Sequence, residues 1–313
     1  MRALKPPIWA RRKRVTLILT QATPRGIVMV SDSAMSKTHP DGRVTERNYT
    51  HWQKIITVPR IAGAISYWGA VGAIADPFDD WLDKLVAKGN YSDLPAFATL
   101  LTEECNRACG SKAIRHGWGI GMHVAGYSTW DDGEPGPTIF HVHNGHGHYS
   151  TEVRVSLLQD GTPEIELRQK WEGEKIREIR RHDDYPRPVS RQENYRLIAA
   201  GEFGLRNGDF NPYAMVRPHL DAAIATMNSF SHISIPRDPN SLECDRALLH
   251  TIMEIMVKLY NCSTACGLVG DEVSSLSISP EGRITTSWHR SGPIHKRPRN
   301  PRRHIYKNRK GMG

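Results

Sequence analysis

The order of strand-like and helix-like segments along the chain constrains its fold more than any single motif does. Runs rich in Val, Ile and Thr predict four strands, at residues 15–21, 26–32, 52–58 and 61–69. Apolar side chains then recur at helical spacing, which predicts two helices, from Asp76 to Gly89 and from Leu94 to Cys109. The first half is therefore a block of strands followed by a pair of helices.

The second half repeats this order. Strand patterns return at residues 118–128, 138–150, 153–159 and 195–201, two helices are expected at 211–227 and 242–261, and a hairpin closes the domain at 273–279 and 283–288. The polar segment 37–48 is predicted to be a loop, and the charged, proline-bearing segment 172–193 an exposed insertion. Separate blocks of each type favour an α+β fold, a four-layer αββα sandwich of two antiparallel sheets.

The termini differ in composition from the centre of the chain. The net charge is +9, and basic residues are concentrated at Arg11–Arg14 and in the tail from Lys296. We therefore expect a basic leader or propeptide at 1–15, one domain at 16–290, and a disordered basic tail at 291–313. Such a tail can contact nucleic acid or another acidic surface weakly, or can simply aid solubility.

The expected compartment follows from the cysteines and from the lack of long apolar runs. Five cysteines, an odd number in a chain of 313 residues, do not resemble a secreted disulfide framework. The apolar run after the basic N-terminus is too short for a signal peptide, and no run approaches the length of a membrane span. We expect a cytoplasmic protein without membrane contact.

Four residues near the strand ends suggest a function. Thr16 starts the first strand, Asp32 in MVSDSA ends the second, Lys54 in QKIITV opens the third, and Gly69 in SYWGAVG follows the fourth. With LIAAGEFG at 197–204 and the closing VGDEVSSLSISPEG, these residues resemble the proteasome β-subunit family, including its bacterial ATP-dependent relatives, among the N-terminal-nucleophile hydrolases.

The resemblance implies a catalytic set. Removal of residues 1–15 would free the α-amine of Thr16, which would take the proton of the Thr16 hydroxyl and make it a nucleophile. Lys54 would supply a fixed positive charge, Asp32 would hold Lys54, and the N–H near Gly69 would donate to the oxyanion. Without the resemblance, Thr16 is equally an ordinary strand residue and Lys54 a surface lysine beside Asp32.

The chain also departs from the family pattern. Val15 stands where self-cleaving members usually carry Gly, and Glu202 replaces a Ser. Asp271 and Ser274 have the family's D-x-x-S spacing, although counting back from the closing turn places that pair near Cys266 and Val269 instead. The roles of Glu202, Asp271 and Ser274 stay open.

These features lead to three expected functions. The first is a threonine-type peptidase or amidohydrolase that needs no cofactor and acts on polypeptides. The resemblance also implies a ring-shaped homo-oligomer and an ATPase partner. The second is a catalytically inactive scaffold subunit on the same fold.

The third expected function is metal binding by the sequence HVHNGHGHYS. If Asn144 and Gly145 form a two-residue turn, four histidines project from one side of the hairpin: His141, His143, His146 and His148. Imidazoles in such a group can bind zinc or nickel. The alternative is an exposed hairpin tip with solvated histidines.

Overall fold

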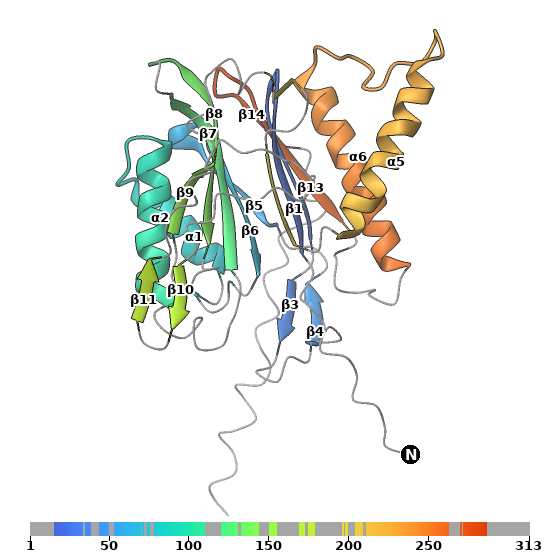
Figure 1. Ribbon diagram of the computed structural model, residues 1–313. Helices are drawn as coiled ribbons and strands as arrows, with labels where there is room; N and C mark the ends of the chain where they lie inside the picture. Colours follow the sequence, from blue (N-terminus) through green and yellow to red (C-terminus); the bar gives the residue numbers. More distant parts are fainter. Residues whose placement is uncertain are drawn as a thin grey trace, which may run out of the picture.

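The computed structural model describes most of the central domain. The described residues are 16–33, 35–38, 44–49, 53–69, 71, 74–75, 78–109, 120–130, 133–143, 150–154, 169–172, 175–178, 196, 198–199, 204–208, 211–262, 270 and 272–286. The expected leader at 1–15, the tail at 291–313, and the residues Val15, Glu202, Cys266, Val269 and Asp271 lie outside them. Figure 1 shows the arrangement of the elements.

One five-stranded antiparallel sheet contains the strand that follows Thr16. Its order is β12-β1-β2-β13-β14. The strands are β12 (Gly204–Gly208), β1 (Leu17–Thr23), β2 (Gly26–Asp32), β13 (Val273–Ile278) and β14 (Ile284–Thr286). The first and last expected strand pairs thus lie in one sheet, where β13 pairs with β2.

The second five-stranded sheet is a meander in chain order, β5-β6-β7-β8-β9. Its strands are β5 (Ile55–Val58), β6 (Gly63–Gly69), β7 (Ile120–Thr129), β8 (Pro135–His143) and β9 (Ser150–Arg154), with a short 3-10 turn, η2 (Pro59–Ile61), between β5 and β6. All neighbouring pairs in it are antiparallel.

Four α-helices are present in the part of the chain that the structure describes. They are α1 (Phe78–Lys88), α2 (Leu94–Cys109), α5 (Asn211–Asn228) and α6 (Leu242–Asn261). Ser241 caps α6 by accepting a hydrogen bond from the Cys244 N–H, and two acids stand in the first turn. Within these described helices, none is long and apolar enough to cross a membrane.

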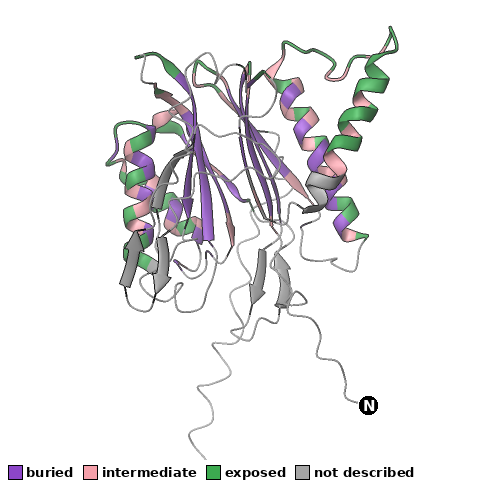
Figure 2. Cartoon of the chain, viewed as in Figure 1, coloured by how far each residue is buried: buried purple, intermediate pink, exposed green. Residues whose placement is uncertain are grey.

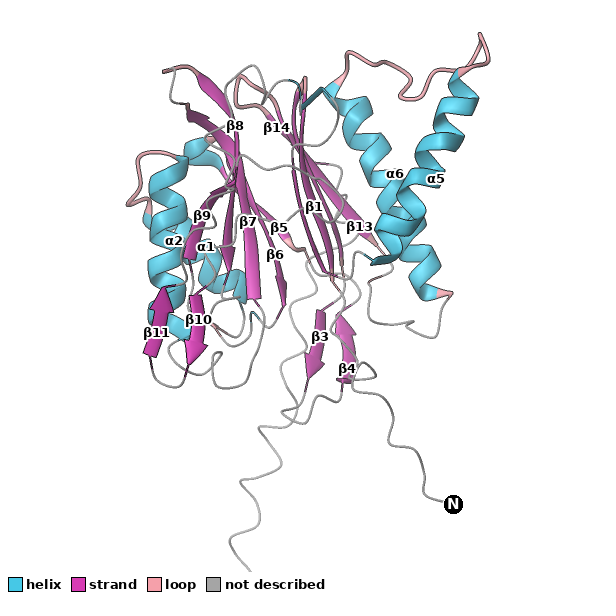
Figure 3. Ribbon diagram, in the orientation of Figure 1, coloured by secondary structure: helices cyan, strands magenta, loops and turns pink. Residues whose placement is uncertain are grey.

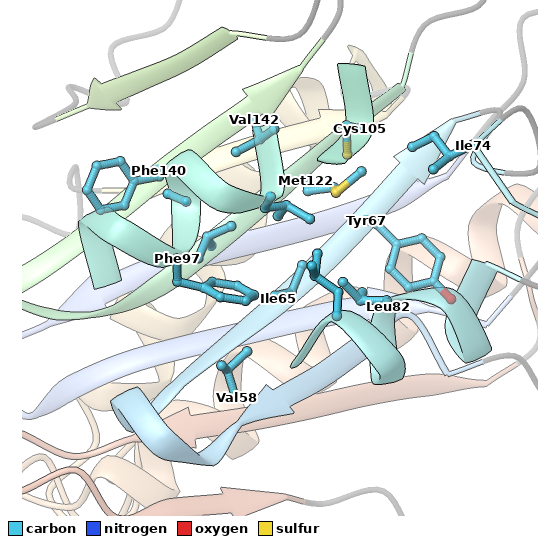
Figure 4. Packing of buried hydrophobic residues seen from close by; sticks show 14 of the residues in the cluster. Val58, Ile65, Tyr67, Ile74, Leu82, Phe97, Cys105, Met122, Phe140 and Val142 are labelled. Carbon is cyan, nitrogen blue, oxygen red and sulfur yellow. The ribbon is translucent and has the colours of Figure 1, made fainter. Parts of the chain in front are cut away.

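Three apolar clusters hold the sheets and helices together. One packs α1 and α2 against β5–β8 and includes Phe97, Ile65 and Met122, as Figure 4 shows. A second packs α6 against β1 and β2, through Met256 and Val30 among others. The third lies between the two sheets and includes Met29, Ala125 and Ile139. Figure 2 shows β1, β2, β6, β7, β8 and β13 mostly buried, while the described part of α5 is largely exposed.

An ion pair ties α6 to the turn between β1 and β2. Arg25 donates from Nε and Nη2 to the two carboxylate oxygens of Asp245, at 2.6 and 2.7 Å. Asp245 is buried and Arg25 is partly exposed. This two-point contact fixes the start of α6 over the sheet.

Two sequence-based expectations about secondary structure are wrong in this structure. The predicted loop 37–48 contains strand residues, because β3 (Met35–Thr38) and β4 (Val44–Tyr49) form a separate two-stranded sheet, visible in Figure 3. The predicted insertion 172–193 includes β11 (Lys175–Glu178), which pairs with β10 (Gln169–Glu172) in another two-stranded sheet.

The second error concerns the expected buried strand at 195–201. Its described residues, Arg196, Ile198 and Ala199, are helical, and the strand β12 begins only at Gly204. A short apolar run occurs both in buried strands and in buried helical turns, so its hydrophobic pattern alone does not distinguish the two. The strand prediction for this segment was therefore wrong.

Candidate functional site

Lys54 is the centre of a buried polar group where the two sheets meet. Its side chain is 2% exposed, and Nζ donates to Asp32 Oδ1 at 2.8 Å. Nζ also lies 3.4 Å from Thr16 Oγ1. Lys54 immediately precedes β5, whereas Thr16 and Asp32 belong to the other sheet, so the contact joins the sheets.

The alternative interpretation, that Lys54 is a surface lysine, is therefore wrong. A buried ammonium needs a charged or hydrogen-bonding partner, which Asp32 supplies. Burial lowers the pKa of Lys54 below its ordinary 10.5, and the neighbouring Asp32 carboxylate partly offsets this by attraction and by hydrogen bonding. The pKa of the Lys54 amine is thus lower than that of a surface lysine.

Asp32 is a fully buried carboxylate that organises the ends of several segments. Oδ1 accepts the Leu17 N–H at 2.9 Å as well as the Lys54 ammonium, and Oδ2 accepts the Gly270 N–H at 3.0 Å. The Leu17 bond fixes the backbone directly after Thr16. Asp32 therefore positions both Lys54 and the start of β1.

Thr16 stands at the first described position before β1 and is half-buried. Alternation along β1 places Ile18, Thr20 and Thr16 on the face toward the second sheet, while Leu17 and Leu19 pack under α6. The hydroxyl of Thr16 consequently points to the side from which Lys54 approaches.

Gly69 ends β6 at its pair with Ile120 and has φ +85°. Only glycine adopts this backbone region without strain, which accounts for glycine at the end of the strand. Lys54 and Gly69 are linked through the β5–β6 pair, because the Lys54 carbonyl accepts the Tyr67 N–H at 3.2 Å.

Ser274 does not join the group around Lys54 through any contact that the structure records. Its hydroxyl lies 2.9 Å from the hydroxyl of Ser31. Its spacing partner Asp271, as well as Cys266, Val269 and Glu202, lies outside the described residues. Gly270 instead contacts Asp32 through its backbone N–H, a contribution that leaves no signature in the sequence.

The histidine hairpin differs from the expected one. His143 pairs with Ser150 and His141 with Glu152, so the connection is longer than a two-residue turn. His141 and His143 are buried at the end of β8, and their rings stack with centroids 4.4 Å apart. His146 and His148 lie outside the described residues, and within those residues no group of His, Cys, Asp or Glu has metal-binding geometry.

A second polar contact between the sheets was not expected from the sequence. His123 on β7 lies with Nδ1 3.0 Å from Thr20 Oγ1 on β1, and its Nε2 contacts Asn207 Oδ1 on β12. Strand alternation alone would place His123 on the face of its sheet that points toward the other sheet. Which strand of the other sheet it contacts depends on how the two sheets stack.

Comparisons with known proteins give limited information. No protein-family model matches the chain, and no curated protein matches it. Among solved structures, an Anbu mutant from Hyphomicrobium sp. strain MC1 is similar at 11% identity and a TM-score of 0.43, over 87% of this chain and 86% of that one.

Proposed function

We propose that this protein is a threonine-type amide hydrolase with a proteasome-like four-layer αββα fold. Thr16 is the nucleophile once residues 1–15 have been removed, and Lys54, Asp32 and Gly69 complete the site. The domain spans residues 16–290, with the tail outside it. Polypeptides are the proposed substrates.

The observation that carries this proposal is the placement of the Lys54 ammonium between a carboxylate and a threonine hydroxyl. Nζ lies 2.8 Å from Asp32 Oδ1 and 3.4 Å from Thr16 Oγ1, in a buried setting. A surface ion pair contributes little to stability, and a buried one is a poor stabilising device compared with apolar packing. The position of the Lys54 ammonium beside the Thr16 hydroxyl is the arrangement that an activated nucleophile requires.

The chemistry follows from these positions. The free α-amine of Thr16 accepts the proton of its own hydroxyl as Oγ1 attacks the amide carbonyl, and the positive charge on Lys54 stabilises the developing alkoxide. The backbone N–H near Gly69 donates to the tetrahedral oxyanion. The leaving amine takes the proton, and water then hydrolyses the ester on Thr16.

The test is the intact mass of the purified protein. The parent and Thr16→Ser should lose residues 1–15, because both keep a hydroxyl at position 16, and Thr16→Ala should stay full-length. A full-length mass for the parent as well as for Thr16→Ala would remove the support for self-processing.

One observation favours the second candidate, a scaffold subunit. Two large apolar side chains are exposed on and just after α5, Met227 at 43% and Phe230 at 53%, and Leu259 on α6 is 48% exposed. Such groups suit a contact between subunits. We therefore propose that a homo-oligomer, in the form of a ring, forms through the surface around Met227 and Phe230, with an ATPase as a further partner of the active form. Light scattering of Phe230→Lys against the parent tests the oligomer.

A further inference from the structure

His123 connects the two sheets at a second point, away from Lys54. It is fully buried on β7 of one sheet, and its ring contacts Thr20 and Asn207 on two neighbouring strands of the other. In the register of those strands, Thr20 pairs with Leu205 and Ile18 pairs with Asn207. One ring therefore fixes β1 and β12 together against β7.

The hydrogen atoms of this contact can be assigned from chemistry. Asn207 Oδ1 can only accept, so the hydrogen is on Nε2 of His123. In the neutral ring Nδ1 then accepts the Thr20 hydroxyl. The His141 ring lies beside the His123 ring, with the two ring centroids 5.5 Å apart.

Position along β1 links His123 to the site. Thr20 lies four residues after Thr16 on the same face, roughly 13 Å along an extended strand. Thr16 is held to the second sheet by Lys54, and Thr20 is held to that same sheet by His123. The apolar Ile18 stands between them and gives no directional contact.

The contact at Thr16 is sensitive to the separation of the sheets. At 3.4 Å, Lys54 Nζ and Thr16 Oγ1 are at the outer limit of a hydrogen bond. A small outward shift of β1 would break this contact, whereas the 2.8 Å bond from Lys54 to Asp32 would survive it.

We propose that His123 is a positioning residue, which holds β1 at the separation from the opposite sheet at which Lys54 reaches the Thr16 hydroxyl. The proposal rests on the proposed function of Thr16, because it assigns His123 a part in presenting that nucleophile. His123 itself does not touch substrate.

The test uses the full chain and the variant Thr20→Val, which removes the hydroxyl while keeping the branched shape. Ile139→Val, which shortens an apolar side chain in the same layer between the sheets, is the matched control. The readouts are the NMR titration of the Lys54 amine, assigned with Lys54→Arg, and the rate at which residues 1–15 are lost. Circular dichroism checks that each variant is folded.

Thr20→Val should move the Lys54 titration by roughly half a pH unit or more and slow the loss of residues 1–15 by about tenfold or more. Ile139→Val should change neither, although it lowers the melting temperature. In the parent, nitrogen NMR should find the His123 hydrogen on Nε2. An unchanged Lys54 titration in folded Thr20→Val would overturn the proposal.

The two proposals fail in different ways. If the parent never loses residues 1–15, self-processing at Thr16 fails, yet the Lys54 titration still reports whether His123 sets the position of β1. If processing occurs at the same rate in the parent and Thr20→Val, the function stands and the positioning role is lost.

Discussion

Lys54 and Asp32 form a fully buried ion pair between the two sheets, with Nζ 2.8 Å from Oδ1 and 2% or less of either side chain exposed. The same ammonium lies 3.4 Å from the Thr16 hydroxyl. This charge pair joins the two sheets and, in the proposed function, also acts on the Thr16 hydroxyl, and substitutions can separate the structural task from the chemical one.

Replacing Lys54 with Met should destabilise the fold and strongly slow processing. Asp32 would remain buried without its counter-ion, which costs about 3–5 kcal/mol in the free energy of unfolding. Loss of the charge beside Thr16 should slow the Thr16-dependent step by about 100-fold or more. Urea unfolding and intact mass measure the two effects.

The control for this substitution is Lys88→Met. Lys88 is 58% exposed and lies 3.9 Å from Glu104, so it forms a surface pair. Its removal should change the unfolding free energy by less than about 1 kcal/mol and leave processing as in the parent. A comparable loss of stability in both variants would contradict the account of Lys54.

The pH dependence of the reaction should reflect the lowered pKa of Lys54. The proposed mechanism requires the charged ammonium, so the rate should fall as pH rises through that pKa, at a pH below 10.5. Lys54→Arg keeps its charge at all accessible pH values and should move this alkaline limb upward. If the fall in rate occurs at the same pH in the folded Lys54→Arg protein, a group other than Lys54 causes it.

Gly69→Ala tests the turn at the end of β6. Both Gly69 and Gly133 have φ +85°, so alanine introduces a similar backbone strain of about 1–2 kcal/mol at either position. Only Gly69 is in the proposed site, whereas Gly133 lies in the β7–β8 turn with open space around its Cβ position. Peptide hydrolysis should fall at least about tenfold in kcat for Gly69→Ala and stay unchanged for Gly133→Ala.

His250 should make the stability of the fold depend on mildly acidic pH. Burial lowers the pKa of His250 below 6.5, with Arg246 acting in the same direction and Glu254 opposing it. The unfolded chain therefore binds a proton at a pH where the native protein does not, so the unfolding free energy falls as pH drops from about 6.5 toward the lowered pKa. His250→Gln should flatten this slope in thermal melts between these pH values. An equal slope in His250→Gln assigns the effect to other groups.

Local patterns predicted much of the fold. The strands β1 and β2 and the helices α2 and α6 lie within two residues of the expected positions, since alternation and helical periodicity are strong in these segments. The errors fall where local pattern is weak. The β3–β4 hairpin is polar, and its strand pairing depends on partners that periodicity does not identify.

The site was only partly accessible from the sequence. Thr16, Asp32 and Lys54 stand at strand ends, and the structure brings these three together. Gly270 donates to Asp32 through its backbone N–H, and the contact of His123 with Thr20 depends on how the sheets stack. Neither contact can be predicted from the local sequence pattern. For the histidine hairpin, a longer connection replaced the expected turn and changed which residues face each other.

The most direct measurement uses a chain that begins at Thr16, produced by cleavage of an N-terminal fusion, and a panel of peptide amides as substrates. The account predicts hydrolysis together with a transient acyl adduct whose mass maps to Thr16, and neither in the same chain with Thr16→Ala. A folded chain with a free Thr16 amine that cleaves no member of the panel and carries no adduct would contradict the assignment of Thr16 as nucleophile.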